Sequence, residues 1–176
     1  MHDIDESRIK PDSFVAYIEI SKGSKNKYEL DKESGLLRLD RILYTSTHYP
    51  QNYGFIPKTF ASDGDPLDVL VLCSESINPS SLVDCYPIGV LEMVDNGSED
   101  QKIIAICGHD PFFNCYKDMD ELPSHLLDEI KHFFAVYKEL EGKSTLVTKI
   151  DSKKRAIEVI SQCIEAYKKR FPKVSQ

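Results

Sequence analysis

The period of the hydrophobic pattern changes once along this chain, and that change constrains the fold more than any other feature. Up to about residue 107 the apolar residues alternate or form short runs, as in strands, beginning with Phe14 to Ile20. Beyond that point they recur three and four residues apart, as on one face of a helix. Many short strands followed by two helices predict a mainly β (α+β) chain, in which a small closed β-barrel carries two C-terminal helices on its outside.

The individual elements follow from the same pattern. Strands are expected at 14–20, 27–31, 36–43, 67–73, 82–94 and 102–107. One helical stripe consists of Leu126, Ile130, Phe133, Tyr137 and Leu140, and the other of Ile157, Ile160, Ile164 and Tyr167. The second helix is expected over 154–171, with Ser152 or Asp151 as its cap. Residues 44–58, rich in Tyr, Pro, Asn and Gly, predict an ordered loop, and the absence of repeats and linkers predicts a single domain over 1–176.

Composition and charge exclude several classes of protein. No apolar run approaches the roughly 20 residues that span a bilayer, and the charged segment 1–11 does not resemble a secretory signal, so we expect a cytoplasmic protein without a membrane partner. The five cysteines include no CxxC pair, which argues against a disulfide framework or a zinc site. The net charge of −7 argues against a nucleic-acid partner, which would need a basic face.

The sharpest local feature is the acidic cluster Asp63-Gly64-Asp65-Pro66-Leu67-Asp68-Val69, at the start of a buried strand. A hard cation such as Mg²⁺ prefers oxygen ligands, and without one two carboxylates 4 Å apart repel by about 4 kcal/mol at an effective dielectric constant near 20. The alternative is an ordinary solvated turn, which most Asp/Gly/Pro clusters are. An EF-hand is excluded because its sixth and twelfth positions would hold Asp68 and Ser74. The motif alone leaves the metal site and the turn about equally favoured.

Further polar residues lie at the edges of predicted strands and helices. Asp95 and Asp100 flank Asn96-Gly97, a hairpin-turn signal, and Lys102 follows two residues later on the same face. Taken singly, each of these has an ordinary structural or surface interpretation, and only their convergence would make a site. The same holds for the other candidates: Glu19, Lys27, Glu29, Arg41, Tyr49, Tyr53, Tyr137 and Lys138.

In their order along the chain, these segments resemble the soluble family I inorganic pyrophosphatases of the bacterial type. The resemblance runs from about Phe14 to Tyr167, and the stretch from Asp63 to Val69 is its most specific part. The other matching segments are Lys27-Tyr28-Glu29, Asp40-Arg41, Tyr49 to Gly54, Pro87 to Val90, Asp95 to Lys102 and His132 to Lys138. The family's fold is an OB-like barrel with flanking helices. Two departures are Asn96, where many members are acidic, and the poorly matching stretch 108–120.

The resemblance implies a role for each matching residue. Asp63, Asp68, Asp95, Asp100 and Glu29 are similar to the ligands of several Mg²⁺ ions in one active site, and Asp65 to the general base. The phosphate-binding set would be Lys27, Arg41, Tyr53, Lys102, Tyr137 and Lys138, of which Arg41, Tyr53 and Lys102 would also assist catalysis, and Glu19 would be a supporting carboxylate. The implied partners are pyrophosphate and phosphate, and family analogy implies a homo-oligomer, commonly a hexamer.

This reading predicts that the chain hydrolyses pyrophosphate through a water or hydroxide bridged by metal ions. The five site aspartates carry −5 and the four basic residues carry +4, so the net charge is −1 before Glu29 is counted, and metal ions should be required to attract a polyanion. Two alternatives remain at this point. One is a Mg²⁺-dependent hydrolase of another diphosphate, and the other is a non-catalytic OB-fold module that binds single-stranded nucleic acid.

Overall fold

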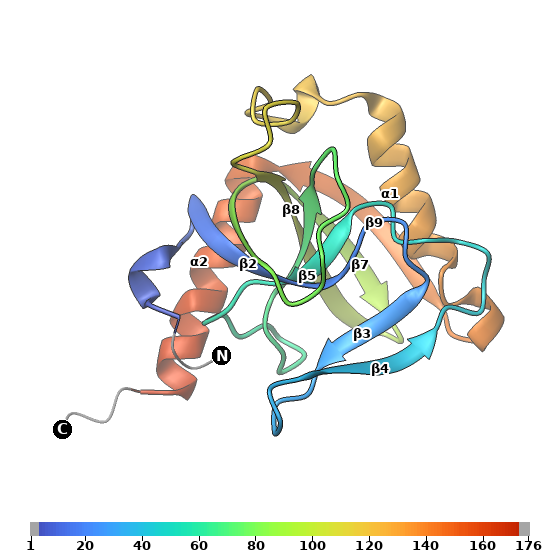
Figure 1. The fold of residues 1–176 in the computed structure, drawn as a ribbon, viewed down its shortest axis with the longest axis horizontal. Coiled ribbons are helices and arrows are strands. Elements are labelled where there is room, and N and C mark those ends of the chain that lie inside the picture. The colour runs from blue at the N-terminus through green and yellow to red at the C-terminus, as the bar shows by residue number, and fades with distance from the viewer. Residues whose placement is uncertain (1–3, 173–176) are drawn as a thin grey trace.

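The computed structural model describes residues 4–172, and its strands and helices follow the predicted order (Figure 1). Residues 1–3 of the charged N-terminal segment and residues 173–176 lie outside the described part. The strands are β1 Ile9–Lys10, β2 Ser13–Ile20, β3 Asn26–Leu30, β4 Leu37–Ile42, β5 Asn52–Phe55, β6 Asp68–Leu72, β7 Leu82–Asp95, β8 Ser98–Cys107 and β9 Thr145–Ser152. The helices are α1 Ser124–Val136 and α2 Lys153–Arg170, with the short 3₁₀ turns η1 Glu6–Arg8, η2 Met119–Glu121 and η3 Glu139–Glu141.

Five of the strands close into a ring. Strand β2 pairs with β5 on one side and with β7 on the other, and the circle β2-β5-β6-β8-β7 leaves no free edge among these five. Among the strand pairs of residues 4–172, only β6–β8 is parallel. The predicted OB-like closed barrel with two C-terminal helices is therefore confirmed. Figure 1 shows α1 and α2 on different sides of the barrel and the β3–β4 hairpin, a separate two-stranded sheet, projecting from it.

Strand periodicity divides the core between two clusters. On β6, Val69 and Val71 belong to the cluster that contains the buried residues of α2, while Leu70 and Leu72 belong to the one that contains the buried residues of α1. Strand β8 alternates in the same way. Because alternate side chains of a strand point to opposite faces, β6 and β8 are buried on both sides and each needs a continuous apolar run.

Two strands lie where the sequence did not predict them. Strand β5 falls inside the expected 44–58 loop, and all four of its residues are buried. Its Gly54 lies against β2 so closely that a Cβ atom there would stand 1.8 Å from the carbonyl oxygen of Tyr17. Strand β9 was not predicted because none of its residues is buried, so it has no clear apolar alternation. It adds an edge strand beside β7.

The ends and the buried faces of the two helices differ slightly from those predicted from the sequence. Helix α1 ends at Val136, so Leu140 lies outside the helix and 67% of its surface is exposed. Helix α2 begins at Lys153 after Ser152, whose hydroxyl accepts the Arg155 N–H as predicted for a cap. The buried stripe of α2 comprises Ala156, Val159, Ile160, Cys163 and Ile164, which shifts the predicted stripe around the helix. Strand β2, expected at 14–20, is buried on both faces.

Two further predictions can be compared with the described residues. None of the helices within residues 4–172 is long and apolar enough to cross a membrane. All five cysteines are free thiols, and Cys115 alone among them is exposed.

Candidate functional site

A buried lysine lies at the centre of the predicted site. Lys102 on β8 is the register partner of Asp68 on the parallel strand β6, and period two places both on the same face as Leu70 and Ile104, towards α1. Lys102 Nζ donates to Asp68 Oδ2 over 2.7 Å and to Asp100 Oδ1 and Oδ2 over 3.1 and 3.0 Å. Only 3% of the lysine side chain is exposed. The β6–β8 pairing therefore turns two acidic segments, 32 residues apart at Asp68 and Asp100, into one cluster.

The electrostatics of this cluster follow from its burial. Burial alone would lower the pKa of Lys102, but Asp68 and Asp100 together outweigh it and hold the pKa above its usual value. Burial raises the pKa of Asp100, and Lys102 offsets only part of that effect. One cation is thus shared between two carboxylates, and the cluster keeps an excess of negative charge.

Aromatic side chains form one wall around Lys102. The Tyr53 hydroxyl on β5 donates to Asp68 Oδ2 over 2.5 Å and accepts from Lys102 Nζ over 3.1 Å. Lys102 Nζ also lies 5.5 Å from the ring centre of Tyr53 and 5.4 Å from that of Phe134 on α1. Burial raises the pKa of Tyr53 well above its usual value, so its hydroxyl stays protonated at neutral pH and available as a hydrogen-bond donor.

Asp95 and Lys138 form a second ion pair at the end of the β7–β8 hairpin. The turn between these strands is Asn96-Gly97, both with positive φ, as the sequence predicted. Lys138 Nζ, just beyond the end of α1, donates to Asp95 Oδ2. The other oxygen, Asp95 Oδ1, is buried and makes no hydrogen bond to any residue of the described part. A buried acceptor without a partner is costly and points to a ligand that completes it.

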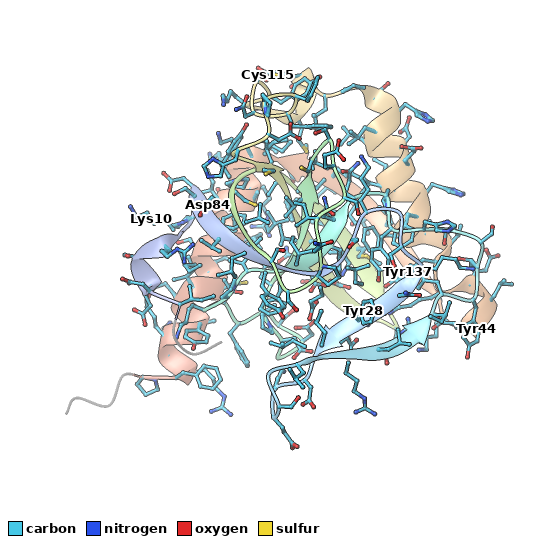
Figure 2. The ribbon with its side chains drawn as sticks, in the orientation of Figure 1. Lys10, Tyr28, Tyr44, Asp84, Cys115 and Tyr137 are labelled. Atoms are coloured by element: carbon cyan, nitrogen blue, oxygen red, sulfur yellow. The ribbon has the colours of Figure 1, made fainter. Side chains whose placement is uncertain are left out.

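Tyr137 interacts electrostatically with both the Lys102 cluster and the Asp95–Lys138 ion pair. The residue lies at the foot of α1, opposite Tyr28 of the β3 strand (Figure 2), and Tyr28 packs against the same core cluster. Burial raises the pKa of Tyr137 far above its usual value, with Lys102 opposing the effect. The carboxylates of Asp95, Asp100 and Asp68 raise the pKa of Tyr137 further. The three aspartates that had to converge for the predicted site are therefore all within electrostatic range of one phenol.

The β3–β4 hairpin supplies a chain of alternating charges. Lys27 Nζ on β3 contacts Glu29 and lies 3.5 Å from Asp40 Oδ2 on β4. The neighbouring Arg41 donates from Nη1 to Asp40 Oδ2 over 2.5 Å and from Nε to Glu141 Oε1 over 2.7 Å. Glu141 was not predicted as a site residue, because its partner is 100 positions away and no spacing marks it.

The turn that contains Asp63 and Asp65 acts on the Lys102 cluster through its charge. Asp63 Oδ1 accepts the Asp65 N–H over 3.0 Å, which shapes the turn, and Asp63 adds to the raised pKa of Asp100. The Asp65 carboxylate is 61% exposed and accepts from Lys32 Nζ over 2.5 Å. Lys32, in the β3–β4 loop, is a second contact that the sequence did not reveal.

Glu19 lies behind the hairpin on β2. Its Oε1 accepts the N–H of Leu30 over 2.8 Å, next to Glu29. Burial raises the pKa of Glu19 to about 7, while the Leu30 hydrogen bond opposes the rise and Asp68 adds to it. The residue is 9% exposed, so it is not the outward-facing strand residue that remained as an alternative.

The donor set suits a hard divalent cation, which prefers carboxylate oxygens. The buried Asp95 Oδ1 without a partner and the excess negative charge around Asp100 both favour added positive charge. Among residues 4–172, no three acidic, histidine or cysteine side chains stand close enough to form a ligand set as they are. Lysines lie among the carboxylates, because Lys102, Lys138 and Lys32 each form an ion pair with one of them. The residues fit such a cation chemically, and the lysines are its competitors for the same oxygens.

Comparison with known proteins identifies a consistent set of relatives. The family model described as inorganic pyrophosphatase matches residues 16–168. An inorganic pyrophosphatase of Halalkalibacterium halodurans is 48% identical over 91% of this chain and 98% of its own length. The solved structure of the Helicobacter pylori inorganic pyrophosphatase is 47% identical, with a TM-score of 0.88, and covers 91% of this chain and 96% of its own. The Thermus thermophilus inorganic pyrophosphatase gives a TM-score of 0.87 at 40% identity, covering 90% and 92%.

Proposed function

Since this chain belongs to the inorganic pyrophosphatase family and hydrolyses pyrophosphate to two phosphates, we propose that the cluster around Lys102 is where it does so. The observation that supports this location is the buried Lys102, shared by Asp68 and Asp100 at 2.7 and 3.0 Å. A buried cation beside carboxylates with unfilled oxygen positions offers one partner for a phosphate and others for divalent cations.

A divalent cation accompanies this chemistry in the family, and we assign it as Mg²⁺, with several ions in one site. Asp63, Asp68, Asp95, Asp100 and Glu29 are the residues that would hold the ions. When bound, such ions supply positive charge to the substrate and make the attacking water more acidic. The unpaired Asp95 Oδ1 supports this assignment, as does the preference of magnesium for carboxylate oxygens.

Cationic and phenolic residues would bind the phosphates. Lys102, Lys138, Lys27 and Arg41 bring four positive charges towards a polyanion, and Arg41 keeps a buried Nη2 that makes no hydrogen bond to a described residue. Their role is to orient the substrate and to neutralise charge that develops on the departing phosphate. Tyr53 and Tyr137 stay protonated because burial raises their pKa, so each would donate a hydrogen bond to a phosphate oxygen. For Tyr53 this means turning its hydroxyl hydrogen away from Asp68 Oδ2.

Asp65 would accept the proton of the attacking water. Its carboxylate is exposed on the turn beside Asp63, where water reaches it. In this scheme Lys32 moves off Asp65 when substrate and cations arrive, since an exposed ion pair of this kind is worth only about 0–1 kcal/mol. Glu19 would support the site by fixing the backbone at Leu30, next to the proposed ligand Glu29.

The test is phosphate release by the purified chain. We expect Mg²⁺-dependent phosphate release from pyrophosphate, little from ATP or from another diphosphate such as ADP, and none in excess EDTA. Replacing EDTA by Mg²⁺ should restore the rate. Activity that persists in EDTA would contradict the metal assignment, and faster hydrolysis of another diphosphate would contradict the substrate.

We also propose a cytoplasmic, homo-oligomeric protein without a nucleic-acid or membrane partner, and a hexamer by analogy with the family. Five free cysteines support a reducing compartment. The exposed Leu36, Leu39 and Ile42 on the β3–β4 hairpin support contact with another copy. Light scattering of the purified chain tests the hexamer directly.

A further inference from the structure

Glu141 is a buried carboxylate that joins two separate sides of the site. It ends η3, the short turn that follows Tyr137 and Lys138, and only 5% of its side chain is exposed. Its strongest contact comes from the β3–β4 hairpin, where Arg41 Nε donates to Glu141 Oε1 over 2.7 Å. A carboxylate is buried like this only with a charged partner. The pair therefore fixes the hairpin relative to the end of α1.

The guanidinium of Arg41 is held on two of its three nitrogen positions. Nη1 donates to Asp40 Oδ2 over 2.5 Å and Nε donates to Glu141. Nη2 is buried and has no hydrogen-bond partner among the described residues. A buried N–H without a partner is costly, so Nη2 is the donor left available for an anionic oxygen.

Asp40 cannot fix this orientation alone. It neighbours Arg41 on β4, its side chain is 36% exposed, and the same Oδ2 also lies 3.5 Å from Lys27 Nζ. Glu141 comes from another element and is more deeply buried. Its second ion-pair partner, the half-exposed Lys143, contacts Oε2 at 3.4 Å and leaves Oε1 to Arg41. Without Glu141, the guanidinium would turn about its long side chain on a single, solvated carboxylate.

We propose that Glu141 is a positioning residue that orients Arg41 so that Nη2 meets a phosphate oxygen of the substrate. The inference rests on the proposed function of Arg41 as a phosphate ligand. Glu141 touches neither the substrate nor the reacting water, so its whole effect on turnover passes through Arg41.

The experiment compares Glu141→Ala, Glu141→Gln and the matched control Glu139→Gln, an exposed carboxylate on the same turn. We expect Glu141→Ala to lower kcat/KM for Mg²⁺-pyrophosphate by roughly 10–100-fold, mainly through KM, because a misplaced ligand loses orientation. Glu141→Gln keeps an oxygen acceptor for Arg41 Nε, so its kcat/KM should lie between those of Glu141→Ala and the unmodified chain. Glu139→Gln should stay within about twofold of the unmodified chain.

A double-mutant cycle separates positioning from a general structural role. In an Arg41→Ala background, adding Glu141→Ala should cause no further loss of kcat/KM, since the two residues act as a unit. If the fold-losses in kcat/KM of the two single mutants multiplied in the double mutant, the proposal would be overturned. Should Glu141→Ala fail to fold, which thermal melting reports, the cycle is run with Glu141→Gln and the same two outcomes apply.

A second readout does not depend on activity. The Arg41 Nε–H resonance, assigned by its loss in Arg41→Ala, should be protected from exchange with water in the unmodified chain and should exchange rapidly in Glu141→Ala. An unchanged resonance in Glu141→Ala would refute the contact. If the unmodified chain released no phosphate, the proposed function would fail, whereas this resonance would still decide whether Glu141 holds Arg41.

Discussion

Replacing Lys102 by methionine tests whether the site carboxylates depend on this one buried cation. Methionine has a similar length and volume, so the change removes the charge and the hydrogen bonds with little cavity. It leaves Asp68 and Asp100 facing each other without the ammonium group that now contacts them at 2.7 and 3.0 Å. The substitution therefore isolates the electrostatic part of the site.

The expected cost is about 3 kcal/mol in the free energy of unfolding. Removing one partner of a buried pair typically costs about 3–5 kcal/mol, because the remaining charge stays buried. The lower end applies here, since the side chains of Asp68 and Asp100 are 30% and 17% exposed and water can reach them in part. The Tyr53 hydroxyl also still donates to Asp68.

The pH dependence of this loss has a definite sign. Burial already raises the pKa of Asp100, and removing Lys102, which opposes the rise, would raise it further. The folded variant then binds a proton more readily than the unfolded chain, so its deficit should be smaller at pH 5 than at pH 8.

The assay is urea unfolding in EDTA at fixed protein concentration, followed by far-UV circular dichroism, because the chain has no tryptophan. Lys168→Met is the matched control, since Lys168 pairs with Glu165 at 2.8 Å but is 54% exposed, and it should cost less than about 1 kcal/mol. A loss below about 1 kcal/mol for Lys102→Met, or one equal to the control, would refute the reasoning.

Two further predictions concern single carboxylates. Asp65→Asn should keep the melting temperature and lower kcat for phosphate release by roughly 10²–10⁴-fold, because the amide cannot accept the proton, and a near-normal rate would remove Asp65 from that role. Burial raises the pKa of Glu19 to about 7 from 4.5, so the folded chain binds the extra proton and loses stability as pH rises through this window. Relative to Glu19→Gln in EDTA, the unmodified chain should lose up to about 3 kcal/mol between pH 4 and pH 8, and parallel stability curves would contradict the assignment.

The sequence predicted those parts of the fold that have a strong period. Both faces of β6 and β8 are buried, so each gave an apolar run, and α1 and α2 gave helical stripes. Strand β5 was missed because the Tyr, Pro, Asn and Gly residues around Gly54 resemble a loop, although close approach to β2 requires that glycine. Strand β9 was hidden because an edge strand with little burial carries no apolar alternation.

For the candidate site, sequence reasoning named candidate residues but could not show which of them pair with each other. Local motifs placed Asp68, Asp95 and Asp100 at strand ends, and the family resemblance added their partners. No local pattern could show that Lys102 lies between Asp68 and Asp100, because this follows from the parallel β6–β8 register. The contacts of Arg41 with Glu141 and of Asp65 with Lys32 depend on tertiary structure for the same reason.

The β6–β8 register also governs how tolerant this region is to insertions. A slip of one residue along β8 would turn Lys102 towards α2 and bring Ile103 opposite Asp68, and it would exchange the inward and outward side chains of the whole strand. The apolar packing of β8 and the contact between Lys102 and Asp68 would be lost together. Insertions should accordingly be tolerated in the 108–120 segment, where Cys115 lies at the upper edge of the molecule in Figure 2, away from Tyr137. They should be rejected between Ser98 and Cys107.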